Sequence, residues 1–548
     1  MAKKNDKTMH IILKYNNTVY DVDTIKEHSN VIENSGKVIW GIIKPSENSP
    51  GVGKAKSAKI KEQLKEKNET YAYFVSKGKV KAKGRIIDIL TNEEVKNEKS
   101  IVPEYYHEAL DRCVAGIKLE SLVDEDKEVI NELERFGTKD GSIAVGNQTN
   151  PLYVSFKDGK KAKSIEVQDI TVLPENEVKD YINNVTAYFS SMGYHFTKED
   201  ISNFYLSLKI KPFVILAGIS GTGKSKMSRL FAEAMGANSS NGRFHIISVK
   251  PDWNDSSELF GYKSITGEFV VGSLTRIVKD AIENPTLPYV VCIDEMNLAR
   301  VEYYLSEYLS IIESRYWDGT KVMTDKIFHD PEYCGDHYIN LYIPQNLYIV
   351  GAVNMDDTTF GFSRKVLDRG NAIEFSNVEF SKIFSEKEYE DESVNLTIHN
   401  EFLQSNYLNI QEIEEEHRDF AKRINDKIET VNELLKTGNR HFAYRVRDEM
   451  IFYMLENRKL KLLKEEEAFD YQIMQKILPT LNGSQVIVRD ILVDLYNYCL
   501  GKTGISTDGD YLSDAEKSLK DAIYPKSASK IIDMLRGYQY DGFSTFWT

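Results

Sequence analysis

The chain has 548 residues, and its 70 Lys or Arg against 84 Asp or Glu give a formal net charge of −14. This length suggests roughly three to four domains with ample room for buried cores. No apolar run approaches the ~20 residues needed to cross a bilayer, and Met1–Lys7 lacks the apolar stretch of a secretory signal. The four scattered cysteines form no CxxC pair, which argues against structural zinc and disulfides and is typical of the reducing cytoplasm.

Residues 1–165 are predicted to form an N-terminal α+β domain built as a small barrel. The apolar run Val38–Pro45 predicts a strand that carries Trp40, and Tyr71–Val75 predicts a second strand. Gly78–Leu90 reads as a hairpin that leads into a third strand.

The same region carries an excess of positive charge within an acidic protein. Residues 37–85 hold 13 Lys or Arg against 4 Glu, and many of them fall on a predicted helix over Lys54–Lys67. Lysines such as Lys54, Lys56 and Lys59 suit contacts with phosphates that do not depend on base sequence. A solvated basic face is the alternative interpretation.

Strands, basic helix and scattered aromatics over about residues 36–160 resemble EVE or YTH-like modules of the PUA-like superfamily. The resemblance implies that a modified DNA base is flipped out and held between aromatic rings. The predicted stacking faces are Trp40 together with one or more of Tyr71, Tyr73 and Phe74. The alternative is that these four rings form the core of the small domain.

Residues 166–200 are predicted to be a linker and a leading helix, and a phosphate loop follows. The stretch Gly218–Ser225 reads GxxxxGKS, with a predicted buried strand at Phe213–Ala217 before it and an amphipathic helix at Lys226–Met235 after it. In this setting backbone N–H groups and the helix N-terminus bind phosphates. Lys224 is expected to reach the β- and γ-phosphates and Ser225 to bind Mg²⁺. The remaining predicted cofactor-binding residues of the loop are Gly218, Ser220, Gly221, Thr222 and Gly223.

A second buried strand, Tyr289–Ile293, ends in Asp294 and Glu295. Ligands bind at the carboxyl ends of strands in open α/β sheets. Asp294 is therefore expected to hold Mg²⁺, mostly through water, and Glu295 to act as the general base on the attacking water. The alternative for the pair is a strand that ends in two surface acids.

A third buried strand, Leu347–Val353, is followed by Asn354, which is expected between the ends of the other two strands, where it can orient the water. Further along, the stretch Ser363–Arg369 contains arginines that are expected to lie away from the phosphate loop of the same chain. Arg369 is predicted to be an arginine finger that reaches a neighbour's nucleotide. A salt bridge on a helix is the alternative for it.

Order and spacing of these parts resemble an AAA+ domain of the McrB type. The extension that includes Asn297, the helix that ends at Glu313 and the stretch Leu259–Tyr262 carry this resemblance. The family motif MNxxD is matched at Asn354 and Asp357, although its Met is replaced by valine, and Asp357 joins Asn354 as a predicted catalytic residue.

The resemblance covers about residues 200–548. It implies an α/β AAA+ nucleotide-binding domain over residues 201–376 and a helical lid and C-terminal helical region over residues 377–548. Phe442–Val446 is similar to the lid segment GYRV, so Arg445 is expected to sense the γ-phosphate and is grouped with the cofactor-binding residues.

McrB-type proteins form hexameric rings, hydrolyse nucleotide, usually GTP, and recruit a separate McrC-like endonuclease. The resemblance thus implies a cytoplasmic GTPase or ATPase that uses Mg²⁺, senses modified DNA and has no nuclease activity or membrane contact of its own. An AAA+ chaperone-like remodeller whose N-terminal domain binds a protein is the competing hypothesis. Binding by the N-terminal domain that is insensitive to salt would favour the remodeller, since phosphate contacts steepen the salt dependence.

Overall fold

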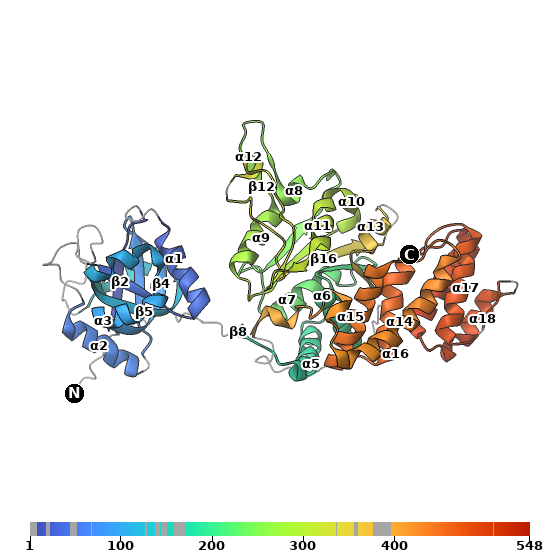
Figure 1. Ribbon diagram of the computed structural model, residues 1–548, viewed down its shortest axis with the longest axis horizontal. Helices are drawn as coiled ribbons and strands as arrows, with labels where there is room; N and C mark the ends of the chain where they lie inside the picture. The colour runs from blue at the N-terminus through green and yellow to red at the C-terminus, as the bar shows by residue number, and fades with distance from the viewer. Residues whose placement is uncertain are drawn as a thin grey trace. The chain divides into compact units, whose positions relative to one another are not determined.

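The computed structural model has two compact units, Met1–Gln168 and Asp169–Thr548, called unit 1 and unit 2 (Figure 1). Each unit is described by itself. The residues described are 8–17, 22–43, 52–66, 68–125, 129–136, 143, 151–157, 170–319, 321–335, 337–355, 360–375, 396–502, 504–507 and 509–547.

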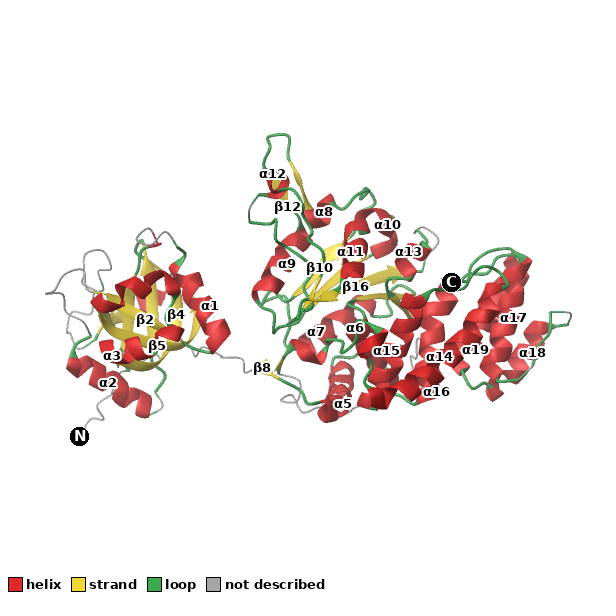
Figure 2. Cartoon of the chain, in the orientation of Figure 1, coloured by secondary structure: helices red, strands yellow, loops and turns green. Residues whose placement is uncertain are grey.

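Unit 1 is a mixed sheet with helices packed around it (Figure 2). Its seven strands lie in the order β2-β5-β4-β3-β1-β7-β6, and of the described pairings only β1 with β3 is parallel. No pairing among the described residues joins the edge strands β2 and β6, so the expected barrel is seen as a sheet with two edges. The elements are β1 (His10–Lys14), α1 (Thr24–Ser35), β2 (Val38–Ile43), α2 (Lys54–Lys65), β3 (Tyr71–Ser76), β4 (Lys79–Thr91), α3 (Asn92–Asn97), β5 (Cys113–Asp124), α4 (Val129–Glu132), β6 (Leu133–Arg135) and β7 (Leu152–Phe156).

Local sequence accounts for the hairpin between β3 and β4. Lys77 and Gly78 both have positive φ, 48° and 76°, as a two-residue turn between antiparallel strands requires. Glycine adopts this geometry at no steric cost, so the turn fixes the register of the pair. The predicted strands at Trp40 and Tyr71 and the basic helix are confirmed. The stretch Gly78–Leu90, predicted to be a hairpin, contributes Gly78 to this turn and otherwise belongs to the single strand β4.

Unit 2 contains a five-stranded parallel sheet in the order β10-β13-β16-β9-β17. Helices α9, α10 and α11 lie on one face and α6 and α7 on the other (Figure 1). Because both faces are covered, β9, β13 and β16 read as continuous apolar runs, which is how these three strands were predicted. Strands β10 and β17 were not predicted. The strands and helices are β8 (Ile170–Thr171), α5 (Glu175–Ser191), α6 (Lys198–Ile210), β9 (Phe213–Gly218), α7 (Lys224–Ala234), β10 (Phe244–Ser248), α8 (Ser257–Phe260), β11 (Gly261–Lys263), β12 (Phe269–Val271), α9 (Ser273–Glu283), β13 (Tyr289–Asp294), α10 (Val301–Tyr304), α11 (Ser306–Ile311), β14 (Tyr316–Trp317), β15 (Val322–Met323), α12 (Pro331–Cys334), β16 (Leu347–Asn354), α13 (Arg364–Leu367), β17 (Asn371–Glu374) and β18 (Thr397–Ile398).

The rest of unit 2 is helical, as predicted. Its long helix α14 has a buried apolar stripe on an otherwise charged surface, the pattern of a helix that packs by one face. The helices are α14 (Glu415–Lys436), α15 (Tyr444–Leu460), α16 (Glu465–Gln472), α17 (Val486–Leu500), α18 (Tyr511–Ser518) and α19 (Pro525–Asp541).

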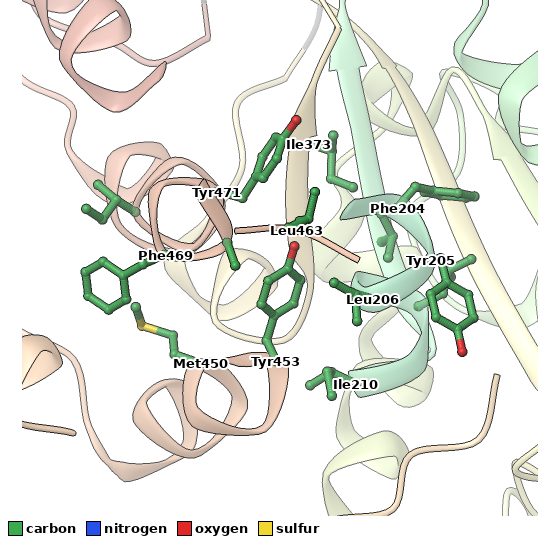
Figure 3. Close-up of a cluster of buried hydrophobic side chains, with 14 of the residues drawn as sticks. Phe204, Tyr205, Leu206, Ile210, Ile373, Met450, Tyr453, Leu463, Phe469 and Tyr471 are labelled. Carbon is green, nitrogen blue, oxygen red and sulfur yellow. The ribbon is translucent and has the colours of Figure 1, made fainter. Parts of the chain in front are cut away.

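One hydrophobic core joins the helical region to the sheet. In Figure 3 Leu206 of α6 lies beside Tyr453 of α15, and Ile373 of β17 lies beside Tyr471 of α16, all within one buried cluster. The expected division at residue 376 therefore falls inside a unit with a shared core. Helix α5, in the segment expected to be a linker and a leading helix, also buries side chains in this core.

None of the helices in the described part of the chain combines the length and the apolar character needed to span a bilayer.

Candidate active site

The phosphate loop joins β9 to α7 in a conformation that only glycine adopts easily. Gly218 has φ of 156°, and a Cβ atom there would lie 2.2 Å from the carbonyl oxygen of Phe375. Gly221 and Gly223 have φ of 87° and 88°. Three glycines thus let the backbone turn over the end of the sheet, with Ser220 and Gly221 exposed and Thr222 half-buried.

Helix α7 and the end of strand β13 meet at Ser225 and Asp294. The Ser225 hydroxyl donates a 2.6 Å hydrogen bond to Oδ1 of Asp294, although 69 residues separate them. Nearby, Nζ of buried Lys224 donates to the carbonyl oxygens of Gly218 at 3.0 Å and Ile219 at 2.7 Å. The lysine therefore lies over the loop, where its ammonium group can meet phosphate oxygens.

The pair Ser225 and Asp294 fits a magnesium site. Mg²⁺ is usually held by one or two carboxylates, waters and substrate phosphates rather than by a complete protein cage. Consistent with this, no group of three or more His, Cys, Asp or Glu side chains suited to a metal occurs among the described residues.

Glu295 and Asn354 flank this point. Glu295 is exposed and has φ of 51°, a strained conformation for a residue other than glycine. Asn354 pairs in register with Gly218, and β16 lies between β13 and β9, so its predicted placement between the two strand ends is confirmed. Asp357 lies outside the described residues.

Asn297 connects two loops of the site, a role that the sequence analysis did not assign to it. Its Nδ2 donates to the carbonyl oxygen of Asn354 at 2.9 Å, and its own carbonyl oxygen accepts from the N–H of Phe360 at 2.9 Å. Asn297 thereby ties the loop after β13 to the loop after β16. Its place two residues after Glu295 was the available signal.

Two aromatic rings on the other side of the phosphate loop were also missed. A Cβ on Gly223 would lie 3.3 Å from the Tyr194 ring and 3.5 Å from the Phe196 ring. Both rings are half-buried and come from the connection between α5 and α6. They are apolar surfaces next to the phosphates, where a nucleotide base can pack.

Arg369 and Arg445 lie near the amino ends of the parallel strands, whereas the phosphate loop lies at their carboxyl ends. Both contact Glu313, which also accepts a 3.0 Å ion pair from Lys211, two residues before β9 begins. Strand β9 then runs six residues, roughly 17 Å, before it reaches Gly218. The start of α15 thus holds Arg445 away from its own phosphate loop, and its expected contact with a γ-phosphate stays a prediction.

The predicted stacking rings of unit 1 are core residues. Tyr71, Tyr73 and Phe74 have no exposed surface, and Trp40 is 7% exposed. The Trp40 ring packs 4.2 Å from His28 and 4.3 Å from Phe74, centroid to centroid. The prediction of open stacking faces is wrong for this structure. Trp40 and Phe74 pack with side chains of α1 and α2, and Tyr71 and Tyr73 pack among side chains of the neighbouring strands.

The basic helix α2 is partly exposed. Lys54 is exposed, whereas Lys56 and Lys59 are half-buried, with their ammonium groups 5.0 Å and 4.7 Å from the centre of the Phe136 ring. These cation–π contacts hold the stems while the charges stay near the surface.

Comparisons with known families agree with the division into units. Residues 11–186 match the Pua-like family model, and residues 213–369 match the AAA domain of the dynein-related subfamily. Residues 390–543 match a domain of unknown function, DUF8727. The chain thus combines a Pua-like N-terminal domain with an AAA+ domain whose α/β fold is the one predicted.

None of the curated proteins compared with this sequence matches it. Among solved structures, a protein from Cytophaga hutchinsonii described as a "putative ATPase" is 13% identical, with a TM-score of 0.32. The match covers 52% of this chain and 79% of that one. At this TM-score it supports no inference about fold or function.

Proposed function

We propose that this chain is a GTP- or ATP-hydrolysing AAA+ motor of the McrB type, which recognises modified DNA through unit 1 and drives a separate McrC-like endonuclease. The observation that carries the hydrolytic part is the 2.6 Å contact between Ser225 and Asp294. It unites a phosphate loop and an acidic strand end at one point, as phosphoryl transfer requires.

Each side chain of the site has a role in this proposal. Lys224 binds the β- and γ-phosphates, and Ser225 and Asp294 hold Mg²⁺, which neutralises phosphate charge when bound. Glu295 takes a proton from the attacking water, and Asn354 orients that water. The rings of Tyr194 and Phe196 pack against the base.

The site is complete only between two subunits. Arg369 and Arg445 lie too far from their own phosphate loop to reach its nucleotide, but a neighbouring subunit can present its phosphates to them. Contacts of this head-to-tail kind close into a ring when the rotation between subunits allows it. We propose a hexamer, on the family resemblance.

Unit 1 supports DNA binding by its charge and its family. Its basic helix α2 suits phosphate contacts, and it matches the Pua-like model. A base-reading surface would have to lie outside the buried rings of Trp40, Tyr71, Tyr73 and Phe74.

That burial also favours the second candidate function. A remodeller whose unit 1 binds a protein needs no open aromatic cage, and the four predicted cage residues form none. The remodeller shares the nucleotide site and differs only in the target of unit 1.

A hydrolysis assay with matched DNA separates these functions. Phosphate release by the full chain is measured with GTP and with ATP, at fixed salt, alone and with modified or unmodified duplexes of one sequence. The restriction motor predicts turnover that modified duplex raises most, with the Lys224→Ala variant as the inactive control. Absence of turnover refutes the motor, and equal rates with and without either duplex favour the remodeller. A McrC-like nuclease gene beside this one would supply the partner for a cleavage assay.

A further inference from the structure

Glu313 lies near the amino ends of the strands, and three cations share its carboxylate. It lies in η6 (Ile312–Ser314), directly after α11. Lys211 Nζ lies 3.0 Å from its Oε1, Arg369 Nε lies 3.8 Å from the same atom, and Arg445 contacts its Oε2. Three distant parts of the chain thus meet at one side chain: the segment just before β9, the segment just before β17, and the start of α15.

Lysine and arginines depend on this carboxylate to different degrees. Lys211 also lies 2.6 Å from Glu449, so it has a second acidic partner. Arg369 and Arg445 form ion pairs with no carboxylate besides Glu313 among the described residues. Without Glu313 the two guanidinium groups would repel each other, while Lys211 would keep its partner.

Both arginines retain donors for an anion. The side chains of Arg369 and Arg445 are 24% and 38% exposed, and no described residue accepts a hydrogen bond from Nη2 of either. A guanidinium has five N–H donors, so each group can keep its contact with Glu313 and offer another edge to a phosphate.

We propose that Glu313 is a positioning residue that holds Arg369 and Arg445 side by side as a two-armed receptor for the γ-phosphate bound by the neighbouring subunit. This inference rests on the proposed function, because it needs a site shared between subunits. Glu313 itself does not touch the nucleotide; it sets the spacing of two groups that do.

The carboxylate is suited to stay ionised. Burial alone would raise the pKa of Glu313, but Lys211 and Arg445 outweigh burial and the pKa is lowered. Its charge therefore persists across the neutral range, and the receptor does not depend on pH there.

The test is Glu313→Gln, which removes the charge and keeps the size. Because misplacement of catalytic groups by about 1 Å can cost ~100-fold, we expect kcat to fall about 100-fold. The KM for the nucleotide should change less than about threefold, because its own phosphate loop is intact. Glu313→Asp keeps the charge and should retain an intermediate kcat, which answers the question if the Gln variant does not fold.

Glu465→Gln is the matched control. Glu465 also binds two cations, Arg423 and Lys427, and is 28% exposed against 21% for Glu313, but it lies in α16. Removal of its charge should lower thermal stability as much as Glu313→Gln does and leave kcat nearly unchanged. An equal loss of kcat in both variants would make Glu313 merely structural.

Mixing of subunits shows whether Glu313 acts with the arginines or with the phosphate loop. Glu313→Gln should regain activity when mixed with Lys224→Ala, which has intact arginines, and should regain none with Arg369→Ala, which is damaged at the same edge. Lys224→Ala and Arg369→Ala are first mixed with each other to show that they restore activity. If they do, recovery of Glu313→Gln with Arg369→Ala, or no recovery with Lys224→Ala, refutes the role of Glu313 and leaves the shared site intact. If those two do not, the shared site of the proposed function is itself refuted, and the inference with it.

Discussion

The two units use their strands differently. In unit 2 the polar site residues Ser225, Asp294 and Asn354 stand at or just beyond the carboxyl ends of strands, where the chain leaves the sheet. In unit 1 the aromatic residues Trp40 and Tyr73 stand inside strands and are covered by packed side chains. A strand end is free to bind a ligand, whereas the middle of a covered strand builds core. Changes in unit 2 should therefore affect rates, and changes in unit 1 should affect folding.

The largest effect is expected from Arg369→Ala. An arginine finger contributes ~10³–10⁵-fold to kcat, and the loss should come without a loss of stability. Phosphate release by the variant, alone and mixed with Lys224→Ala subunits, measures it. Mixtures should regain part of the activity, since some interfaces pair an intact loop with an intact arginine. A mixture no more active than the sum of its parts would place Arg369 outside the neighbour's site.

Glu295→Gln should lower turnover by ~10²–10⁴-fold, the usual contribution of a general base. Nucleotide binding should persist, because Lys224, Ser225 and Asp294 are unchanged. Binding of a fluorescent nucleotide and phosphate release are measured on the same sample. Hydrolysis at the wild-type rate would show that another group activates the water.

Trp40→Ala tests whether the covered strands of unit 1 build core. Truncation of a buried tryptophan typically costs about 3–5 kcal/mol, so unit 1 should unfold at lower denaturant concentration. Basal hydrolysis per folded molecule should not change. Trp317→Ala, whose side chain in β14 is 41% exposed, is the control and should cost about 0.5 kcal/mol or less. If Trp40→Ala has normal stability and loses only its preference for modified DNA, Trp40 is part of an aromatic cage and not of the core.

Acid should unfold unit 1 before unit 2. Burial lowers the pKa of His28 to about 4, and burial together with Lys83 lowers that of His10 to about 4. The unfolded chain then binds more protons below pH ~6.5, so each histidine removes about 3 kcal/mol of stability as the pH falls towards 4. In unit 2 the pKa of Glu449 is lowered to about 2 by Lys211 and Lys476 against burial, and its stability is lost only below pH ~4.5.

Hydrogen exchange, followed peptide by peptide between pH 7 and 4, distinguishes the two units. His28→Phe should flatten the pH dependence in unit 1 and leave unit 2 unaltered. Earlier loss of protection in the α15 peptides than in the β3 peptides would contradict the assignment.

The smallest effect is expected from replacement of Lys54, Lys56 and Lys59 by glutamine. Each phosphate contact contributes ~0.9 to the slope of log K against log salt, so the slope should fall by up to ~3. Affinity should drop equally for modified and unmodified duplexes. Lys517→Gln in unit 2 is the control, and an unchanged slope in the triple variant would exclude α2 from DNA binding.

The site residues that the sequence predicted in the right place belong to motifs that fix their own backbone. Gly218 to Ser225 specify a turn, and Asp294 follows directly from the end of an apolar strand. The sequence could not place Arg445 relative to the phosphate loop, because its position depends on how α15 packs against residues more than one hundred positions away. The rings of Tyr194 and Phe196 have no motif, and Trp40 fits a core and a cage equally well until the covering helices are known.

The core between α6 and the C-terminal helices has a mechanical consequence. A hinge between the sheet and α15 or α16 would expose Leu206, Tyr453 and Tyr471, which are almost fully buried together (Figure 3). Exposure of one large apolar side chain costs about 1.5–3 kcal/mol, so bending at this place is expensive. Unit 2 is therefore built as a stiff block. In the proposed motor, the movements that follow hydrolysis are then expected between whole subunits rather than within unit 2.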